Sequence, residues 1–536
     1  MVASRPVSTV PLSRLIQPSW WLLLATLGAA VALRLYGLDH LPGINADEAV
    51  FPVHASEWMS GVPLSELRTG TNLPMNPLFF GLVALIQYCL PTSLWTLRLA
   101  ALAHSLLSVA LGFVLFRKRG PTFAVVFACL LAVLPIQLGY ARLAWDPTAV
   151  PTAVVLALAA ATRGRSIETA LAFGLCLWVH PATALVAPIL LTPLILRKWP
   201  RKADGSLRAP SKEALAIAAL GSALAVALFS QLVARDALPT PVLAALRGEL
   251  PAKVWERLTN PGSALEFARL YADFLAGPTI YRYVTGSMPE LAANLHLAAA
   301  VVLLGAFVLP ALVRLPAATR RTDRAVALGL GLSLVGAYLV GGLPVLAPHT
   351  ERYGMFLVVP SCYVLAACVE GFAVTPVRAA FARLGIAALG AALLASFGIY
   401  FLAALHQADP ARHNTFRCGA VDPKQRAFEQ ILAWRSPDRT GVVRAEDWWL
   451  YWPLRYLAGA GGELRVSIDG ARWDYRFPAD FMLPELDPDA TEVFGVAWAG
   501  SDFDARLARD ARERVEVGGY EPGPILRVYR LSPPRE

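Results

Sequence analysis

The sequence predicts a polytopic α-helical membrane protein that carries a small α/β domain at its C-terminal end. Of its 536 residues, 56% are hydrophobic, and the mean hydropathy is +0.50. Apolar runs recur from Trp20 to Leu405, many of them close to the roughly 20 residues that a helix needs to cross the hydrocarbon core. The charge balance changes after residue 405, because the tail holds 18 Lys and Arg against 21 Asp and Glu, while the preceding part holds 30 against 18.

The apolar runs define the helical part. They occupy residues 20–38, 77–90, 95–116, 121–140, 148–162, 167–180, 181–196, 213–234, 291–313, 325–343, 354–369 and 384–405. No small-residue cleavage site follows the first run, so we expect a retained span and not a signal peptide. The run 77–90 is short and bounded by Pro77 and Pro91, which is more typical of a re-entrant or interfacial segment. We therefore expect about eleven spans plus one re-entrant or interfacial helix.

The distribution of Lys and Arg predicts which loops face the cytoplasm. If 77–90 does not cross, the inner segments hold 19 Lys and Arg, whereas the short outer loops hold only Arg68, Arg142 and Arg352. If it crosses, every later basic loop moves outside, against the positive-inside rule. We therefore expect a multi-pass protein of the plasma (inner) membrane with a cytoplasmic N-terminus. Its first outer loop, residues 39–94, and its tail would share the extracytoplasmic face.

The tail differs in kind from the rest of the chain. Residues 1–405 are expected to form the transmembrane domain, and residues 406–536 a separate extracytoplasmic α/β domain. Helices are expected at 422–434 and 448–457, and strands at 441–445, 463–468, 492–498 and 525–531, where β-branched residues alternate with polar ones. The aromatic segment 447–452 is expected to pack rather than to bind a sugar.

The cysteines and basic residues exclude two kinds of site. Of the six cysteines only Cys418 lies in the tail, and none has a metal-binding spacing, so neither a tail disulfide nor a cysteine metal site is expected. The basic residues lack the interleaved aromatics of a nucleic-acid surface, so no nucleic-acid partner is expected.

The most informative pattern is a pair of carboxylates just after the first span, within residues 41–49. Asn45 is typical of a helix N-cap, and Glu48 at the third helical position completes a variant of the capping box, which predicts a helix over 46–60 along the membrane surface. Capping is therefore one interpretation of Glu48. Asp47 has no such duty, so we interpret it as a catalytic base, the alternative being a solvated acid that favours the helix dipole.

Two further residues could complete a metal or donor site. His54 lies seven residues after Asp47 on the same helical face and could share a metal ion with it, although a polar surface explains it equally well. Asp146 lies at the outer end of the third crossing and could hold a metal or the donor phosphate, unless it pairs with Arg142 four residues earlier. A divalent metal is therefore a candidate cofactor.

Several cationic residues are candidates for binding a phosphate. Arg34 lies one turn inside the outer end of the first span, where it either snorkels or pairs with Asp47 or a lipid phosphate. Arg352 and Tyr353 lie in a late outer loop, and a guanidinium there suits bidentate contact with a phosphate or anchors the interface. Arg142 is a further candidate for the phosphate, and His349 is one for the metal or donor.

Taken together, these patterns resemble the C-type glycosyltransferase superfold, whose members take a sugar from a polyprenyl-phosphate carrier at the outer membrane face. Two families share the pattern: the protein O-mannosyltransferases of family 39 and the bacterial lipid A aminoarabinose transferases. The resemblance is carried by Arg34 through Ala49, by the run 77–90 with Ser93-Leu-Trp-Thr-Leu-Arg-Leu99, by Ala141-Arg142 with Asp146 and, more weakly, by Glu351-Arg352-Tyr353.

The resemblance implies an integral membrane glycosyltransferase that moves a sugar, with inversion, from a polyprenyl phosphate to an acceptor glycan, lipid or protein. It implies that Asp47 is the general base with Glu48 in support, that Asp146 helps to hold metal or donor, and that Arg352 contacts the lipid phosphate. One departure is the segment 73–77, Leu-Pro-Met-Asn-Pro, where aminoarabinose transferases carry Lys-Pro-Pro. The lysine that binds phosphate is therefore absent.

Three other functions stay open. A transporter or flippase of lipid-linked sugars would place ionisable residues at mid-membrane depth and broken helices in paired halves, and few charges lie deep in these runs. A non-catalytic cell-envelope assembly protein would keep the fold without the chemistry. A lipid-linked oligosaccharide ligase would use outer arginines but would not need the early acidic pair.

Overall fold

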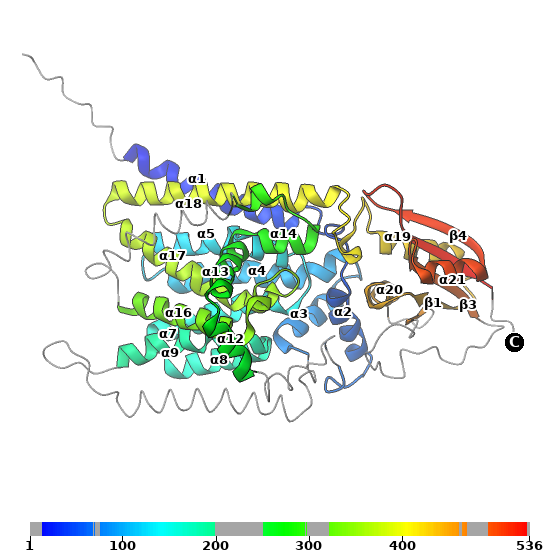
Figure 1. Cartoon of the computed structure of the whole chain (residues 1–536), viewed down its shortest axis with the longest axis horizontal. Coiled ribbons are helices and arrows are strands. Elements are labelled where there is room, and N and C mark those ends of the chain that lie inside the picture. Colours follow the sequence, from blue (N-terminus) through cyan, green and yellow to red (C-terminus); the bar gives the residue numbers. More distant parts are fainter. Residues whose placement is uncertain are drawn as a thin grey trace, which may run out of the picture.

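The computed structural model describes residues 13–67, 69, 75–198, 250–294, 296, 321–459, 464–468 and 491–532. The apolar run 213–234, most of the run 291–313 and Arg68 lie outside these residues. The described chain forms a helical body, with a five-stranded sheet and its helices at one end (Figure 1).

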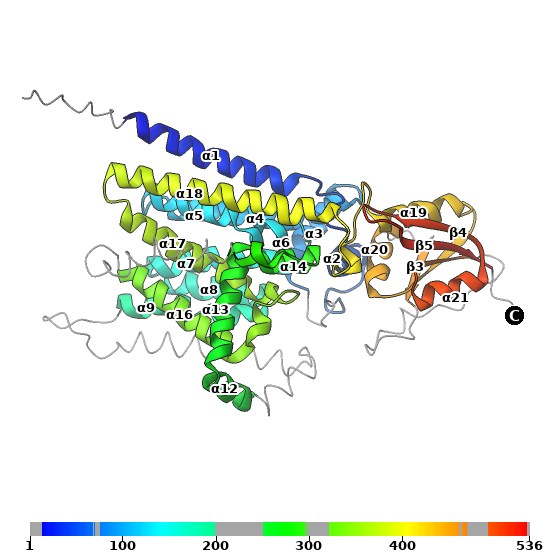
Figure 2. The same ribbon diagram turned by 45° about the horizontal axis from the view of Figure 1, so that its top comes forward.

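The expected, mostly helical architecture of the body is confirmed. In chain order its elements are α1 (Ser13–Leu35), α2 (Ala46–Met59), α3 (Pro77–Cys89), α4 (Leu94–Phe116), α5 (Pro121–Val133), α6 (Pro135–Tyr140), η1 (Asp146–Ala149), α7 (Val150–Arg163), α8 (Ser166–Val179), η2 (Pro181–Val186), α9 (Ala187–Lys198), α12 (Leu250–Thr259), α13 (Pro261–Ala276), α14 (Pro278–Thr285), α16 (Arg321–Gly341), η4 (Leu343–Val345), η5 (Glu351–Leu357), α17 (Val358–Phe372), α18 (Pro376–Phe397), η6 (Gly398–Ala403) and η7 (Ala404–His406). Helices α1 and α18 lie side by side along one edge of the body (Figure 2).

Four described helices are long and apolar enough to cross a membrane: Leu94–Phe116, Arg321–Gly341, Glu351–Phe372 and Pro376–His406. Shorter apolar helices are Trp20–Leu35, Leu78–Cys89, Pro121–Val133, Ser166–Val179 and Pro181–Arg197. A proline interrupts one of the predicted spans. Pro135 divides the run 121–140 into α5 and α6. The number of crossings stays a prediction.

The helix expected at 46–60 is confirmed as α2, with the expected cap. The Asn45 side chain accepts the Asp47 N–H at 2.8 Å, and Glu48 accepts the Asn45 N–H at 2.7 Å, which completes a capping box. Eight residues of α2 are buried, and the helix packs between α3 and the tail domain, while its position on the membrane surface stays a prediction.

Glu48 is a buried charge whose oxygens are occupied by protein donors. Arg98 of α4 donates to Oε1 at 2.8 Å and to Oε2 at 3.2 Å, and the Ala144 N–H donates to Oε2 at 3.1 Å. Both charged side chains are at most 1% exposed. These contacts agree with the capping and supporting roles considered for Glu48, since its carboxylate joins the segment before α2 to α4 and to the segment before Asp146.

Two buried guanidiniums hold the chain between α1 and α2. Arg98 donates to the carbonyls of Leu38 and Pro42, both at 2.9 Å. Arg142 donates to those of Tyr36 at 2.6 Å and Leu41 at 2.7 Å. Arg142 therefore binds backbone carbonyls instead of the phosphate or Asp146, the two partners considered for it. The contacts of both arginines also satisfy backbone carbonyls that burial would otherwise leave unpaired.

The tail forms the expected α/β domain, with α19 (Pro423–Trp434), α20 (Trp448–Ala458) and α21 (Asp502–Asp510). Its strands are β1 (Thr440–Ala445), β2 (Leu464–Ile468), β3 (Thr491–Trp498), β4 (Ala511–Gly518) and β5 (Pro524–Leu531), in the order β2-β1-β3-β5-β4. Strands β2, β1 and β3 are parallel, and β5 is antiparallel to both of its neighbours. The four expected strands are confirmed, whereas the charged edge strand β4 and helix α21 were missed.

The start of the tail packs against the first outer loop. Asp422, which is fully buried, accepts the Ile44 N–H at 2.7 Å. Gly43 lies so close to the Arg417 carbonyl that a Cβ atom would stand 2.2 Å from its oxygen, which requires glycine there. The loop that carries Asp47 is therefore held by both domains.

We expect Arg98→Met to destabilise the protein by about 3–5 kcal/mol, because it leaves the Glu48 charge buried without a partner. The measurement is the midpoint of thermal unfolding in detergent. A double variant, Arg98→Met with Glu48→Leu, should recover part of the loss because no buried charge is left. Arg165→Met is the matched control: the Arg165–Glu168 pair is more than half exposed, so its loss should cost under about 1 kcal/mol. A double variant less stable than Arg98→Met would contradict this account.

Candidate active site

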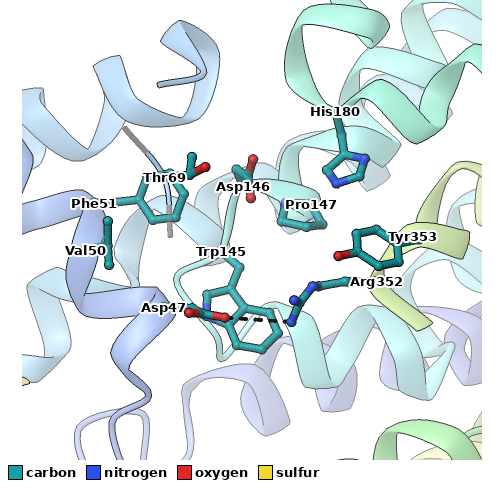
Figure 3. Close-up of a pocket in the computed structure, with 10 residues that line it drawn as sticks. All are labelled: Asp47, Val50, Phe51, Thr69, Trp145, Asp146, Pro147, His180, Arg352 and Tyr353. Carbon is teal, nitrogen blue, oxygen red and sulfur yellow. Dashed lines mark ion pairs between the residues drawn. The ribbon is translucent and has the colours of Figure 1, made fainter. Parts of the chain in front are cut away.

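A pocket with a free volume of about 80 Å³ lies where the helical body meets the tail domain. Its lining residues, shown in Figure 3, are Asp47, Val50, Phe51, Thr69, Trp145, Asp146, Pro147, His180, Arg352 and Tyr353. They come from α2, from the segment between α2 and α3, from η1 and the residue before it, from the α8–η2 turn and from η5. The fold therefore brings together Asp47, Asp146, Arg352 and Tyr353, which the sequence singled out separately.

Two opposite charges approach each other across this pocket. Arg352 Nη1 lies 3.8 Å from Asp47 Oδ2 (Figure 3), and the Trp448 Nε1–H of α20 lies 3.4 Å from Asp47 Oδ1. The side chains of Asp47 and Arg352 are 31% and 21% exposed, so both can be reached from the pocket. A separation of 3.8 Å is close to the outer limit of an ion pair, so neither group is saturated by the other.

Aromatic rings hold the Arg352 guanidinium in place. Its Cζ lies 5.0 Å from the centroid of the Trp145 ring and 5.4 Å from that of Tyr353, which is the range of a cation–π contact. Element η5 begins at Glu351, which is fully buried and accepts the Tyr140 hydroxyl at 3.2 Å. The first turn of η5 is therefore anchored in the helical body, and Arg352 projects from a fixed backbone.

The pKa values of both pocket carboxyls, Asp47 and Asp146, are raised. Burial raises the pKa of Asp146 to about 7; the charge of Arg352 opposes this effect, and the Asp47 carboxylate adds to it. Burial also raises the pKa of Asp47 above its ordinary value, against the charge of Arg352 and the hydrogen bond from Trp448. Carboxyls with raised pKa values in a pocket are typical of acid–base sites.

His180 contributes a neutral ring. Burial lowers its pKa to about 4, and the charge of Arg352 acts in the same direction. Its Nδ1 accepts the Ala182 N–H at 3.1 Å, so the neutral ring carries its proton on Nε2 and offers one donor. The ring lies 5.4 Å from that of Tyr353 (Figure 3).

Five of the nine expected site residues lie away from the pocket lining: Glu48, Arg142, His54, Arg34 and His349. Arg34 is 1% exposed and donates to Ser105 Oγ and to the carbonyls of Ala30 and Ala132, so it neither snorkels nor pairs with Asp47. His349 packs edge-on against Tyr283 with ring centroids 4.9 Å apart. Its φ of 80° is rare for a residue other than glycine and turns the chain just before η5.

His54, considered either as a ligand of a shared metal ion or as part of a polar surface, contacts other side chains in the structure. His54 Nδ1 lies 2.5 Å from Glu57 Oε2, and its ring packs edge-on against Trp452 of the tail at 5.2 Å. Within the part of the chain that the structure describes, no group of three His, Cys, Asp or Glu side chains could hold a metal ion. Asp47 and Asp146, the other residues considered as metal ligands, share their pocket with the Arg352 guanidinium.

Two pocket residues, Trp145 and His180, and one neighbour of Asp47, Trp448, were missed as functional by the sequence analysis. Trp145 directly precedes Asp146. Its position next to a candidate acid is the signal by which the sequence could have indicated it. His180 was missed because a single histidine carries no motif. Trp448 comes from the aromatic segment that was expected to pack, and nothing in the chain links it to Asp47, which lies 401 residues earlier.

No family model and no curated protein match the chain. The solved structure of ArnT from Cupriavidus metallidurans in the apo state is similar, with a TM-score of 0.53 and 15% identity over 96% of this chain and 98% of that one. ArnT bound to undecaprenyl phosphate matches with a TM-score of 0.52 and 14% identity over 95% and 98%. The chain thus has the fold of the C-type membrane glycosyltransferases, as its resemblance predicted.

The raised pKa of Asp146 predicts a dependence of stability on pH. Between the ordinary pKa of 3.8 and the folded value of about 7, the folded protein binds this proton more than the unfolded chain does, so the contribution of Asp146 to stability falls as the pH rises. Asp146→Asn cannot ionise. We therefore expect its thermal midpoint to rise relative to wild type between about pH 5 and about pH 8.

Glu66→Gln serves as the control, because that side chain is exposed and its variant should differ from wild type by the same small amount at each pH. A difference between Asp146→Asn and wild type that does not change with pH would contradict the raised pKa of this carboxyl.

Proposed function

We propose that the chain is an integral membrane glycosyltransferase that moves a sugar from a polyprenyl-phosphate donor to an acceptor hydroxyl, with Asp47 as the general base. The observation that supports this best is the pairing of Asp47 with Arg352 in a pocket that also contains Asp146. A base for the acceptor hydroxyl and a cation for the phosphate are the two groups that the reaction needs close together.

The proposed transfer needs one base and no strong acid. The acceptor oxygen bonds to the anomeric carbon while the bond from that carbon to the phosphate oxygen breaks, and the acceptor proton passes to Asp47. The phosphate leaves with the bonding electron pair as a stable anion, so it needs no proton, unlike the leaving group of ordinary glycoside hydrolysis. A single displacement of this kind inverts the anomeric configuration. Asp47 then returns its proton to water.

The surroundings of Asp47 and Arg352 suit these two roles. A carboxylate whose pKa is raised by burial is a stronger base wherever it is ionised. The guanidinium of Arg352 is permanently charged and presents its N–H groups in a plane that fits phosphate oxygens. The rings of Trp145 and Tyr353 keep it in place when its partner changes from carboxylate to phosphate.

We assign phosphate binding to Arg352. Asn76, which lies in the segment where the aminoarabinose transferases carry a lysine, has a structural role instead. Its Oδ1 accepts the N–H groups of Leu78 and Phe79, which caps α3, and its Nδ2 donates to the Val179 carbonyl at 3.1 Å. Among the described residues that line the pocket, Arg352 is the one permanent cation.

The rest of the pocket suits a sugar and its carrier. The Asp146 carboxyl and the Nε2–H of neutral His180 can bond to sugar hydroxyls, while Val50, Phe51 and Pro147 offer apolar surface next to the phosphate. ArnT was solved with undecaprenyl phosphate bound, which supports a polyprenyl-phosphate donor for a chain of this fold. The site would face the extracytoplasmic side of the inner membrane, with the N-terminus in the cytoplasm, and the acceptor would be a glycan, lipid or protein.

We expect Asp47→Asn to lower the rate of sugar transfer by about 100-fold or more, since the amide keeps the shape of the side chain but cannot take the proton. The assay uses the purified protein with defined polyprenyl-phosphate sugars. Asp39→Asn, which removes an exposed carboxyl from the same loop, should keep wild-type activity. Equal rates for Asp47→Asn and wild type would exclude this mechanism, and movement of lipid-linked sugar across a bilayer without transfer would indicate a transporter.

We expect Arg352→Met to raise the KM for the donor and to lower kcat, with a total loss in kcat/KM of about 100-fold, because the guanidinium stabilises the phosphate before and during its departure. Arg352→Lys should lose less, since it keeps the charge without the planar fork. Arg282→Met is the matched control, because Arg282 is 30% exposed and also lies 3.8 Å from its carboxylate partner, Asp273. An unchanged KM and kcat in Arg352→Met would separate this residue from the donor.

A further inference from the structure

The tail domain contacts Asp47, which lines the pocket of the helical body. Trp448, the first residue of α20, donates its Nε1–H to Asp47 Oδ1 at 3.4 Å, while Arg352 stands 3.8 Å from Oδ2. The two oxygens of the proposed base are therefore approached from two different domains. A separate module attached only by a linker would have no such contact.

The start of α20 is fixed within its own domain. Its N-cap, Asp447, accepts the Leu450 N–H at 3.0 Å with Oδ1 and the Trp498 Nε1–H at 2.8 Å with Oδ2. The preceding residue, Glu446, accepts the backbone N–H of Trp498 at 2.9 Å. Both contacts tie the first turn of α20 to the end of β3, so Trp448 is presented from a rigid backbone.

The rest of α20 docks against the helical body along one face. The residues that make these contacts lie at positions 448, 452, 455 and 456, the spacing of a single helical face. Trp452 packs edge-on against His54, Arg455 pairs with Glu57, and the Tyr456 hydroxyl donates to the Ser93 carbonyl at 2.8 Å. His54 and Glu57 thus belong to the interface between the domains, which gives them a role other than the metal binding expected for His54.

We propose that Trp448 is a positioning residue for Asp47, so that the tail domain completes the active site; this rests on the proposed function. The indole N–H holds Oδ1, which orients the carboxylate and leaves its other oxygen to face Arg352. Holding a catalytic group in one reactive orientation is a large part of what an active site contributes to rate. An indole N–H suits this duty because it donates a hydrogen bond without carrying a charge that would cancel the base.

The same hydrogen bond has an electrostatic effect that can be measured. It favours the ionised carboxylate and therefore opposes the rise in the pKa of Asp47 that burial causes. Trp448→Phe keeps a ring against Trp452, whose centroid lies 5.3 Å away, and removes only the donor. The pKa of Asp47 should then rise by about 0.5–1 unit, which is the range for an ordinary hydrogen bond.

The first measurement needs no substrate. A hydrophobic carbodiimide reacts with protonated carboxyls, so its rate of labelling at Asp47, followed against pH by peptide mass spectrometry, reports the fraction protonated. We expect the labelling midpoint in Trp448→Phe to shift upward by about 0.5–1 pH unit. Trp449→Phe is the matched control, because that ring packs edge-on against His413 and its variant should leave the midpoint where it is. Thermal midpoints of the two variants show whether either has lost its fold.

The second measurement is sugar transfer. In Trp448→Phe the acid limb of the pH profile should move upward by the same amount, and kcat should fall about 3–10-fold with an unchanged KM for the donor. Adding Trp448→Phe to Asp47→Asn should cause no further loss. An unshifted labelling midpoint with wild-type kcat would overturn the positioning role, while a loss of activity in Asp47→Asn alone would still support the proposed function. A shifted midpoint in a protein that transfers no sugar would overturn the proposed function and keep the link between Trp448 and Asp47.

Discussion

The buried ion pair between Glu48 and Arg98 is the interaction on which the geometry of the site depends. It fixes α2 against α4, and the remaining donors of Arg98 hold the carbonyls of the loop that leads to α2. Successive residues of an α-helix point about 100° apart, so a helix that turns Glu48 inward must turn Asp47 to another side. That side is the pocket, and the position of the proposed base is therefore set by the buried residue next to it.

The arginines near the site differ in how many protein acceptors each one has. Arg34, Arg98 and Arg142 are at most 1% exposed and direct their N–H groups at carbonyls, a hydroxyl or a buried carboxylate. Arg352 is 21% exposed, faces two aromatic rings and has Asp47 only at 3.8 Å. Burial with several short hydrogen bonds to protein acceptors makes the first three structural, whereas Arg352, with its single distant acceptor, is able to bind a ligand.

Local sequence patterns predicted the parts of the structure that depend on local interactions. The capping box of Asn45 and Glu48 and four of the five strands could be found because cap and strand patterns span a few residues. The partner of Glu48 lies 50 residues away, and Trp448 lies 401 residues from Asp47, so no local pattern could pair them. The same limit explains why His54 was considered for a metal: its place on α2 was right, but the tail helix that covers it could not be foreseen. β4 was missed because a charged edge strand lacks the apolar alternation by which strands are recognised.

The pairing of Asp47 with Arg352 gives the proposed transfer an internal balance of charge. In the ground state the guanidinium favours the ionised form of Asp47, against the effect of burial. As Asp47 takes the acceptor proton it loses its charge, and in the same step the departing phosphate gains one. The attraction between Arg352 and Asp47 therefore weakens as the phosphate begins to need a cation, and the guanidinium can change partners without leaving the ring of Trp145. The total charge of the pocket stays constant throughout, so negative charge moves from one neighbour of Arg352 to another at little electrostatic cost.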